Sequence, residues 1–115
     1  MHAMDVPMSR PAARHRKLPS MNEAQLYAVS EMFKALSDPT RLRLLTALSQ
    51  GEACVHELCD HLDMSQPAVS HQLRLLRVQR LVAARRAGRE IFYSLADEHV
   101  LDLVRAASTH ADEAR

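Results

Sequence analysis

The sequence has no tryptophan and only two tyrosines and two phenylalanines, so aromatic residues make up 3% of its 115 positions. Large sheets usually rely on aromatic and β-branched side chains, and their scarcity favours packed helices with a core of leucine, valine, alanine and methionine. Apolar residues amount to 47% of the chain, which is enough for the core of one compact domain. At this size an interface with a second copy would add substantially to the buried surface.

Long apolar runs are also missing. None approaches the length of a membrane-spanning helix, and the first twenty residues are polar and contain three prolines, unlike a secretory signal. We therefore expect a cytoplasmic protein without a membrane partner. The two cysteines, Cys54 and Cys59, lie five residues apart on what the pattern predicts to be one helix, so they point in different directions. Reduced thiols are expected.

The net charge of +1 hides a division of charge along the chain. Residues 1–20 carry four basic and one acidic side chain, and residues 21–38 have a balance of −2. Residues 39–89 hold eight arginines against four acidic side chains, whereas residues 90–115 have a balance of −4. A basic middle section suits a surface that binds a polyanion such as nucleic acid, and the acidic C-terminal section indicates an element with another role.

The expected elements are mostly helices. Residues 1–20 show no periodicity and are predicted to form a mobile basic arm that could touch DNA phosphates. Apolar residues at helical spacing predict a first helix over residues 22–36 and a second over 39–51. A short helix over 55–62 and a longer one over 66–79 then form a helix-turn-helix. Residues 21–115 are therefore expected to form a single domain.

The helix over residues 66–79 has the features of a DNA recognition helix. Ser65 is a suitable cap, while Val69, Leu73 and Leu76 form its buried stripe. Short polar side chains at the start of such a helix suit the major groove. We predict that the DNA-binding residues of this segment are Ser65, Gln66, Val69, Ser70, His71, Gln72 and Arg74.

Two strands, over residues 82–86 and 90–95, are predicted to flank a turn at Ala87-Gly88-Arg89. We interpret this hairpin as a wing. Arg85, Arg86 and Arg89 near its tip could reach phosphates or an adjacent minor groove. The predicted fold class is therefore mainly α with a small β-hairpin, a winged helix-turn-helix.

Good zinc ligands lie near both ends of the acidic C-terminal section: Asp97, His99, His110 and Glu113. His99 and His110 are eleven residues apart, which at the rise of an α-helix separates them by roughly 16 Å along the axis. One helix therefore cannot bring all four side chains to one ion. In two antiparallel copies, the Asp97/His99 end of one helix would meet the His110/Glu113 end of the other. The spacing predicts a dimer and a metal together.

Three segments resemble the ArsR/SmtB family of metal-sensing repressors: residues 36–45 (LSDPTRLRLL), 65–73 (SQPAVSHQL) and 88–95 (GREIFYSL). The resemblance covers roughly residues 22–115. Asp97-x-His99 followed by His110-x-x-Glu113 is similar to the C-terminal helix site of the zinc-responsive, SmtB-like branch. The resemblance implies a homodimer, formed through the first and last helices, that binds operator DNA without metal and releases it when Zn(II) occupies the intersubunit sites. In the family, coupling runs from the downstream histidine towards the end of the recognition helix, here from His110 to the carbonyl of Arg80.

Other sensing chemistries stay open. Co(II) or Ni(II) would more often need additional ligands, which His2 and His15 of the arm could supply. Residues 52–56 resemble the region where cadmium, lead or arsenic sensors of the family place thiolates. Cys54, His56 and Cys59 are thus an auxiliary metal or thiol candidate, although His56 stands where the cadmium pattern has a second cysteine. An enzyme is not expected, because no motif pairs a nucleophile with a base and the zinc site has no open position.

Overall fold

The computed structural model describes residues 17–114, so most of the predicted arm, with His2 and His15, lies outside the described residues. Within this range no helix is both long enough and apolar enough to span a membrane. The elements follow in the order α1 (Glu23–Leu36), α2 (Pro39–Leu48), β1 (Ala53–Cys54), α3 (Val55–Leu62), α4 (Gln66–Val78), β2 (Val82–Ala87), β3 (Glu90–Leu95) and α5 (Glu98–Glu113). The predicted winged helix-turn-helix is confirmed.

Side-chain caps determine where the long helices begin. Asn22 Oδ1 accepts from Gln25 N at 2.8 Å and Gln25 Oε1 accepts from Asn22 N at 3.0 Å, a capping box that starts α1. Asp38, Ser65 and Asp97 each accept a main-chain N–H through their side chains at the starts of α2, α4 and α5. These contacts are local in sequence, which explains why the predicted helix starts agree closely with the structure.

The wing is an antiparallel hairpin in which β2 pairs with β3, from Val82 opposite Leu95 to Ala87 opposite Glu90. A third strand, β1, extends the sheet in the order β1-β3-β2 and was not predicted. Its Cys54 pairs with Phe92, so the expectation that Cys54 lies on the same helix as Cys59 was wrong. A two-residue strand is too short to produce a periodic pattern, and the pairing partner lies far along the chain.

The core lies where α2, α3 and α4 meet the base of the sheet. All of its fully buried large side chains are aliphatic: Leu44, Leu45, Leu58, Leu73, Leu76, Leu81 and Val69. This confirms that leucine and valine replace aromatic residues in the core. No polar or charged residue in the described part of the chain is buried.

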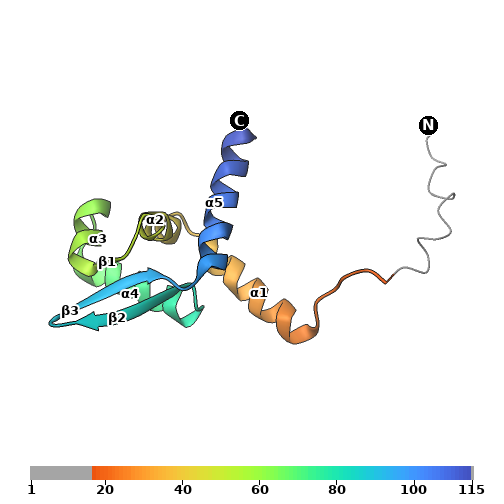
Figure 1. Cartoon of the computed structure of the whole chain (residues 1–115), viewed down its shortest axis with the longest axis horizontal. Helices are drawn as coiled ribbons and strands as arrows, with labels where there is room; N and C mark the ends of the chain where they lie inside the picture. Colours follow the sequence, from red (N-terminus) through yellow and green to blue (C-terminus); the bar gives the residue numbers. More distant parts are fainter. Residues whose placement is uncertain (1–16, 115) are drawn as a thin grey trace.

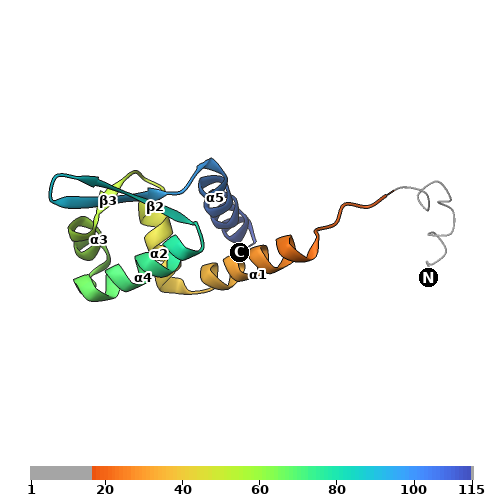
Figure 2. The ribbon, with the colours of Figure 1, turned by 90° about the horizontal axis from the view of Figure 1, so that it is seen from below.

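The helices α1 and α5 extend away from this core (Figures 1 and 2). Val100 is the one buried residue of α5, and every described residue of this helix from Arg105 onwards is exposed. On α1, Tyr27 is 70% exposed and Phe33 is 54% exposed. Phe33 also lines an apolar groove with Leu103 and other side chains of α1, α2 and α5. A large bare apolar surface of this kind usually marks an interaction site.

Leu73→Ala should lower the free energy of unfolding by about 2–5 kcal/mol, because Leu73 is fully buried on α4 and its truncation leaves a cavity. Urea denaturation at one protein concentration measures this loss. The matched control is Leu75→Ala on the same helix, since Leu75 is 38% exposed and should cost about 1 kcal/mol or less. Equal losses in the two variants would contradict the assignment of the core.

Candidate DNA-binding surface and metal site

A three-residue turn joins α3 to α4. Asp63 ends α3 in the left-handed region, with φ 54°, and the N–H of Met64 donates to the carbonyl of Cys59 at 3.1 Å. Ser65 Oγ then accepts from Ala68 N at 3.3 Å and starts α4. The turn fixes the second helix of the pair at an angle to the first, as a helix-turn-helix requires.

The outer face of α4 carries most of the side chains of residues 65–74 that were predicted to bind DNA. Gln66, His71 and Arg74 are exposed and Ser70 is half-buried. Val69 is fully buried, so its assignment to the DNA-binding residues was wrong; it packs in the core beside Leu73 and Leu76, which lie on the same side of the helix.

Gln72 is already engaged within the protein. Its side chain is half-buried, and its Oε1 atom accepts a hydrogen bond from Arg41 Nη1 at 3.3 Å. Arg41 belongs to α2, thirty-one residues earlier, and no local sequence signal connects the two residues. The amide of Gln72 is therefore held by α2 before any DNA arrives.

The three wing arginines differ in their surroundings. Arg85 Nε and Nη2 donate to Glu52 Oε2 and Oε1, both at 2.7 Å, and the guanidinium carbon lies 5.2 Å from the centre of the Phe92 ring. The hydrogen bond from Arg85 lowers the pKa of Glu52, and the same bond raises the pKa of Arg85. Arg86 and Arg89 are exposed, with no such ion pair among the described residues. The charge of Arg85 is thus balanced by Glu52, which lies just before β1.

The four predicted metal ligands lie at the two ends of α5. Asp97 caps the helix through Oδ1, which accepts from Val100 N at 3.0 Å, and His99 Nδ1 lies 3.6 Å from the same oxygen. The His99 side chain is 95% exposed. His110 and Glu113 are exposed one turn apart at the other end of the helix.

Within residues 17–114 no three histidine, cysteine or carboxylate side chains converge on a point that could hold a metal ion. The residues nevertheless fit a shared site. Each end of α5 offers one imidazole and one carboxylate, both on the surface, and the second oxygen of Asp97 is not used by its cap contact. Half of a tetrahedral donor set is therefore available at each end of the helix.

The auxiliary candidate near Cys54 is less suited to thiolate chemistry. Cys54 is 6% exposed, and both cysteines are free. The main-chain N–H of Glu57 favours the thiolate, but burial and the carboxylates of Glu90 and Glu57 outweigh it and raise the pKa of Cys54. His56 is exposed on the first turn of α3. A raised thiol pKa disfavours the thiolate that both metal binding and oxidation require.

The predicted coupling pair is not in contact within one described chain. Arg80 follows α4 in the left-handed region, with φ 60°, and its N–H donates to the carbonyl of Arg77 at 3.0 Å. His110 is exposed near the far end of α5 and forms no side-chain hydrogen bond to Arg80 in the described part of the chain. Any link between them remains a prediction.

A tight turn, a capped helix with polar side chains on its outer face and a two-stranded basic wing define a winged helix-turn-helix DNA-binding protein. The model of the bacterial regulatory protein arsR family matches residues 38–84. A relative from Synechocystis, named Transcriptional repressor SmtB homolog, is 52% identical over 94 residues, which cover 82% of this chain and 70% of the relative. The chain belongs to the ArsR family.

Two further comparisons agree with this assignment. The HTH-type transcriptional repressor SmtB of Mycobacterium tuberculosis is 41% identical over 88 residues, covering 76% of this chain and 65% of the relative. The solution structure of a homodimeric winged helix-turn-helix domain from Mycobacterium bovis, a possible ArsR-family regulator, has a TM-score of 0.76 and 32% identity, covering 84% of this chain and 92% of that one. The relatives are transcriptional repressors, so the expectation of a regulator rather than an enzyme is confirmed.

Arg86→Ala should weaken DNA binding and reduce the slope of log affinity against log salt by about 0.9, because a free wing arginine that meets a phosphate releases one counterion. Arg85→Ala should change the slope much less, since Glu52 already balances its charge. Fluorescence anisotropy over a range of salt concentrations measures both slopes. Equal reductions in the two variants would show that DNA displaces Glu52.

Iodoacetamide should modify Cys59 faster than Cys54 at about pH 7.5, because Cys54 is buried whereas Cys59 is half-buried, and the raised pKa of Cys54 disfavours the thiolate that alkylation needs. Mass spectrometry of the native protein gives the two rates, with Cys54→Ser confirming the assignment of the peptide. Faster modification of Cys54 would contradict this expectation and favour the thiol-sensing alternative.

Proposed function

We propose that this protein is a metal-responsive transcriptional repressor whose homodimer binds operator DNA without metal and releases it when Zn(II) binds between the α5 helices. The observation that carries the proposal is the pair of exposed half-sites, Asp97/His99 and His110/Glu113, at opposite ends of one helix. The names of the repressor relatives support the regulatory role.

A homodimer through α1 and α5 is supported by the apolar surface that these helices leave bare. Leu26, Tyr27 and Phe33 are exposed on α1, and the adjacent groove continues onto α5. The solved relative from Mycobacterium bovis is a homodimer. A two-fold interface would bury the same surface on both copies and give two equivalent metal sites.

The donor set favours zinc. Two imidazole nitrogens and two carboxylate oxygens suit a tetrahedral Zn(II) ion and leave no open position for a catalytic water. Bound zinc would supply a four-coordinate link that fixes the ends of two helices relative to each other. His99 and Asp97 would hold it from one protomer, and His110 and Glu113 from the other.

Regulation then requires only that zinc favour one arrangement of the dimer over another. A ligating imidazole usually donates its second N–H to an oxygen, and for His110 we propose the carbonyl of Arg80 as that acceptor. Because Arg80 lies two residues beyond the last residue of α4, this contact would move or restrain the recognition helix. Coupling of about 1–3 kcal/mol between the metal and DNA sites is typical of such switches.

Zinc added in stoichiometric amount should weaken operator binding at least tenfold, because it favours the arrangement with lower DNA affinity. Fluorescence anisotropy at fixed salt measures the affinity with chelator and then with zinc. His110→Ala and the double variant His99→Ala/His110→Ala should keep metal-free DNA binding and lose the zinc effect. His61→Ala is the matched control, an exposed histidine on α3 whose loss should leave the zinc effect intact.

A zinc effect that survives in the double variant would refute the α5 site. If zinc has no effect on the wild-type protein, the same titration with Ni(II) and Co(II) tests the alternative in which His2 and His15 add ligands. Cys54→Ser/Cys59→Ser tests the thiol alternative, which is excluded if regulation in the variant is unchanged.

A further inference from the structure

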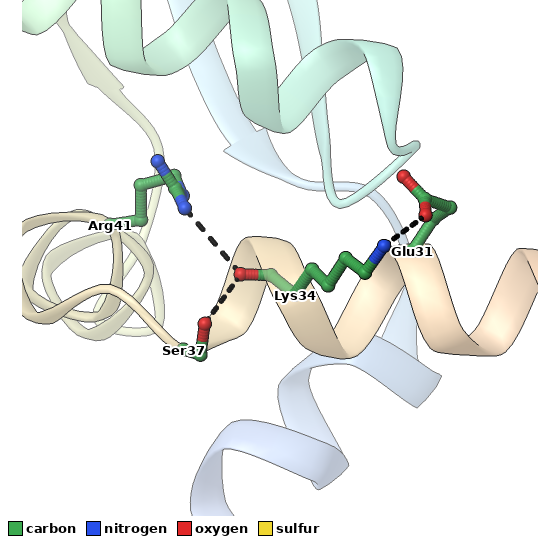
Figure 3. A network of polar contacts seen from close by, with 4 residues as sticks. All are labelled: Glu31, Lys34, Ser37 and Arg41. Atoms are coloured by element: carbon green, nitrogen blue, oxygen red, sulfur yellow. Dashed lines mark hydrogen bonds and ion pairs between the residues drawn. The ribbon is translucent and has the colours of Figure 1, made fainter.

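Arg41 lies where three helices meet. It is the third residue of α2, and its side chain reaches the end of α1 and the middle of α4. Nε donates to the carbonyl of Ala35 at 2.7 Å, Nη2 to the carbonyl of Lys34 at 3.5 Å and Nη1 to Gln72 Oε1 at 3.3 Å. Figure 3 shows the guanidinium directed at the carbonyl of Lys34.

The carbonyls of Lys34 and Ala35 belong to the last turn of α1, at the negative end of the helix dipole. The Lys34 carbonyl already accepts from the main-chain N–H of Ser37 at 3.2 Å. Ser37 Oγ also donates to the carbonyl of Lys34 at 2.7 Å, while the Lys34 side chain turns away to pair with Glu31 (Figure 3). A positive guanidinium is well suited to this position. Arg41 therefore fixes the end of α1 against α2.

The same side chain then holds α4. Gln72 stands next to His71 on the recognition helix, and its amide accepts from the guanidinium nitrogen that α1 does not use. A guanidinium can make these contacts together because its N–H groups point in fixed directions in one plane. A lysine ammonium, with a single nitrogen, cannot reach both helices in this way.

We propose that Arg41 is a positioning residue for DNA binding, which sets the orientation of α4 relative to α1 through Gln72. The inference rests on the proposed contact of α4 with DNA and the proposed dimer through α1. In such a dimer two recognition helices must meet successive major grooves about 34 Å apart. A small rotation of α4 against α1 would change that separation, so the Arg41 contacts would determine how well the unliganded dimer fits its operator.

Arg41→Lys tests this role, because it keeps the positive charge and one possible hydrogen bond but removes the planar set of N–H groups that contacts both helices. We expect the dimer dissociation constant, measured by sedimentation equilibrium, to change less than threefold. Operator affinity, measured by anisotropy with chelator, should fall about tenfold with an unchanged salt slope. Arg43→Lys is the matched control: Arg43 is exposed two residues further along α2, and operator affinity should change less than twofold.

A double-mutant cycle with Gln72→Ala tests whether Arg41 affects DNA binding through its contact with Gln72. If Arg41 acts through Gln72, Arg41→Lys should cost much less affinity in the Gln72→Ala background than in the wild type. Gln72→Ala removes the contact of Arg41 to α4 and leaves its contacts to α1 in place, so it separates the two effects of this side chain.

Three results would overturn the inference. A salt slope reduced by about 0.9 in Arg41→Lys would make Arg41 a phosphate contact. A lower melting temperature with unchanged operator affinity would make it a cap of α1 alone. Failure of the wild-type protein to bind operator DNA would refute the proposed function, and this inference with it. Loss of the zinc response alone would refute the metal proposal while the role of Arg41 stands.

Discussion

Burial of the apolar stripe of α4 is the constraint on which the rest of the structure depends. Val69, Leu73 and Leu76 are fully buried, and once they face the core the opposite side of the helix must face outwards with Gln66 and His71. The same packing joins α4 to α2, α3 and the base of the wing in one aliphatic core. The outer helices α1 and α5 are left with bare faces, and a second copy is the natural way to cover them.

The features that the sequence predicted well are those encoded over a few residues. Caps such as Asn22 and Ser65 and the apolar periodicity of each helix act within one or two turns, so the helices and the wing could be recognised. The contacts that were missed join distant parts of the chain. Glu52 pairs with Arg85 and Arg41 with Gln72, each across more than thirty residues, and β1 exists only because β3 lies beside it. The four α5 ligands can share an ion only when a second copy of the chain is present. The spacing in the sequence predicts that copy, but the contacts that would bring the two half-sites together lie between chains.

The contacts of Arg41 and Arg85 also change the interpretation of the basic charge in residues 39–89. Residues 39–89 hold eight arginines, and their number suggested a surface for a polyanion. Arg41 and Arg85 are committed to oxygen acceptors within the protein, so part of the basic charge stabilises the arrangement of helices and wing. The charge offered to DNA is therefore smaller than the composition suggests, and among the wing arginines it rests on the exposed Arg86 and Arg89. Arg86 and Arg89 have no partner within the described residues, so ordering them on DNA would cost side-chain conformational entropy.

Asp97 links the start of α5 to the proposed metal site. Its Oδ1 atom caps the helix by accepting from Val100 N, a contact typically worth about 1 kcal/mol. A metal bound through the other oxygen would leave the cap in place, and the added positive charge would draw electron density from the carboxylate that caps the helix. Ligation through Oδ1 would instead compete with the cap and loosen the first turn, which contains His99. The two modes would differ in whether metal binding stiffens or frays α5. Because α5 begins three residues after the end of β3, either effect would arise close to the wing.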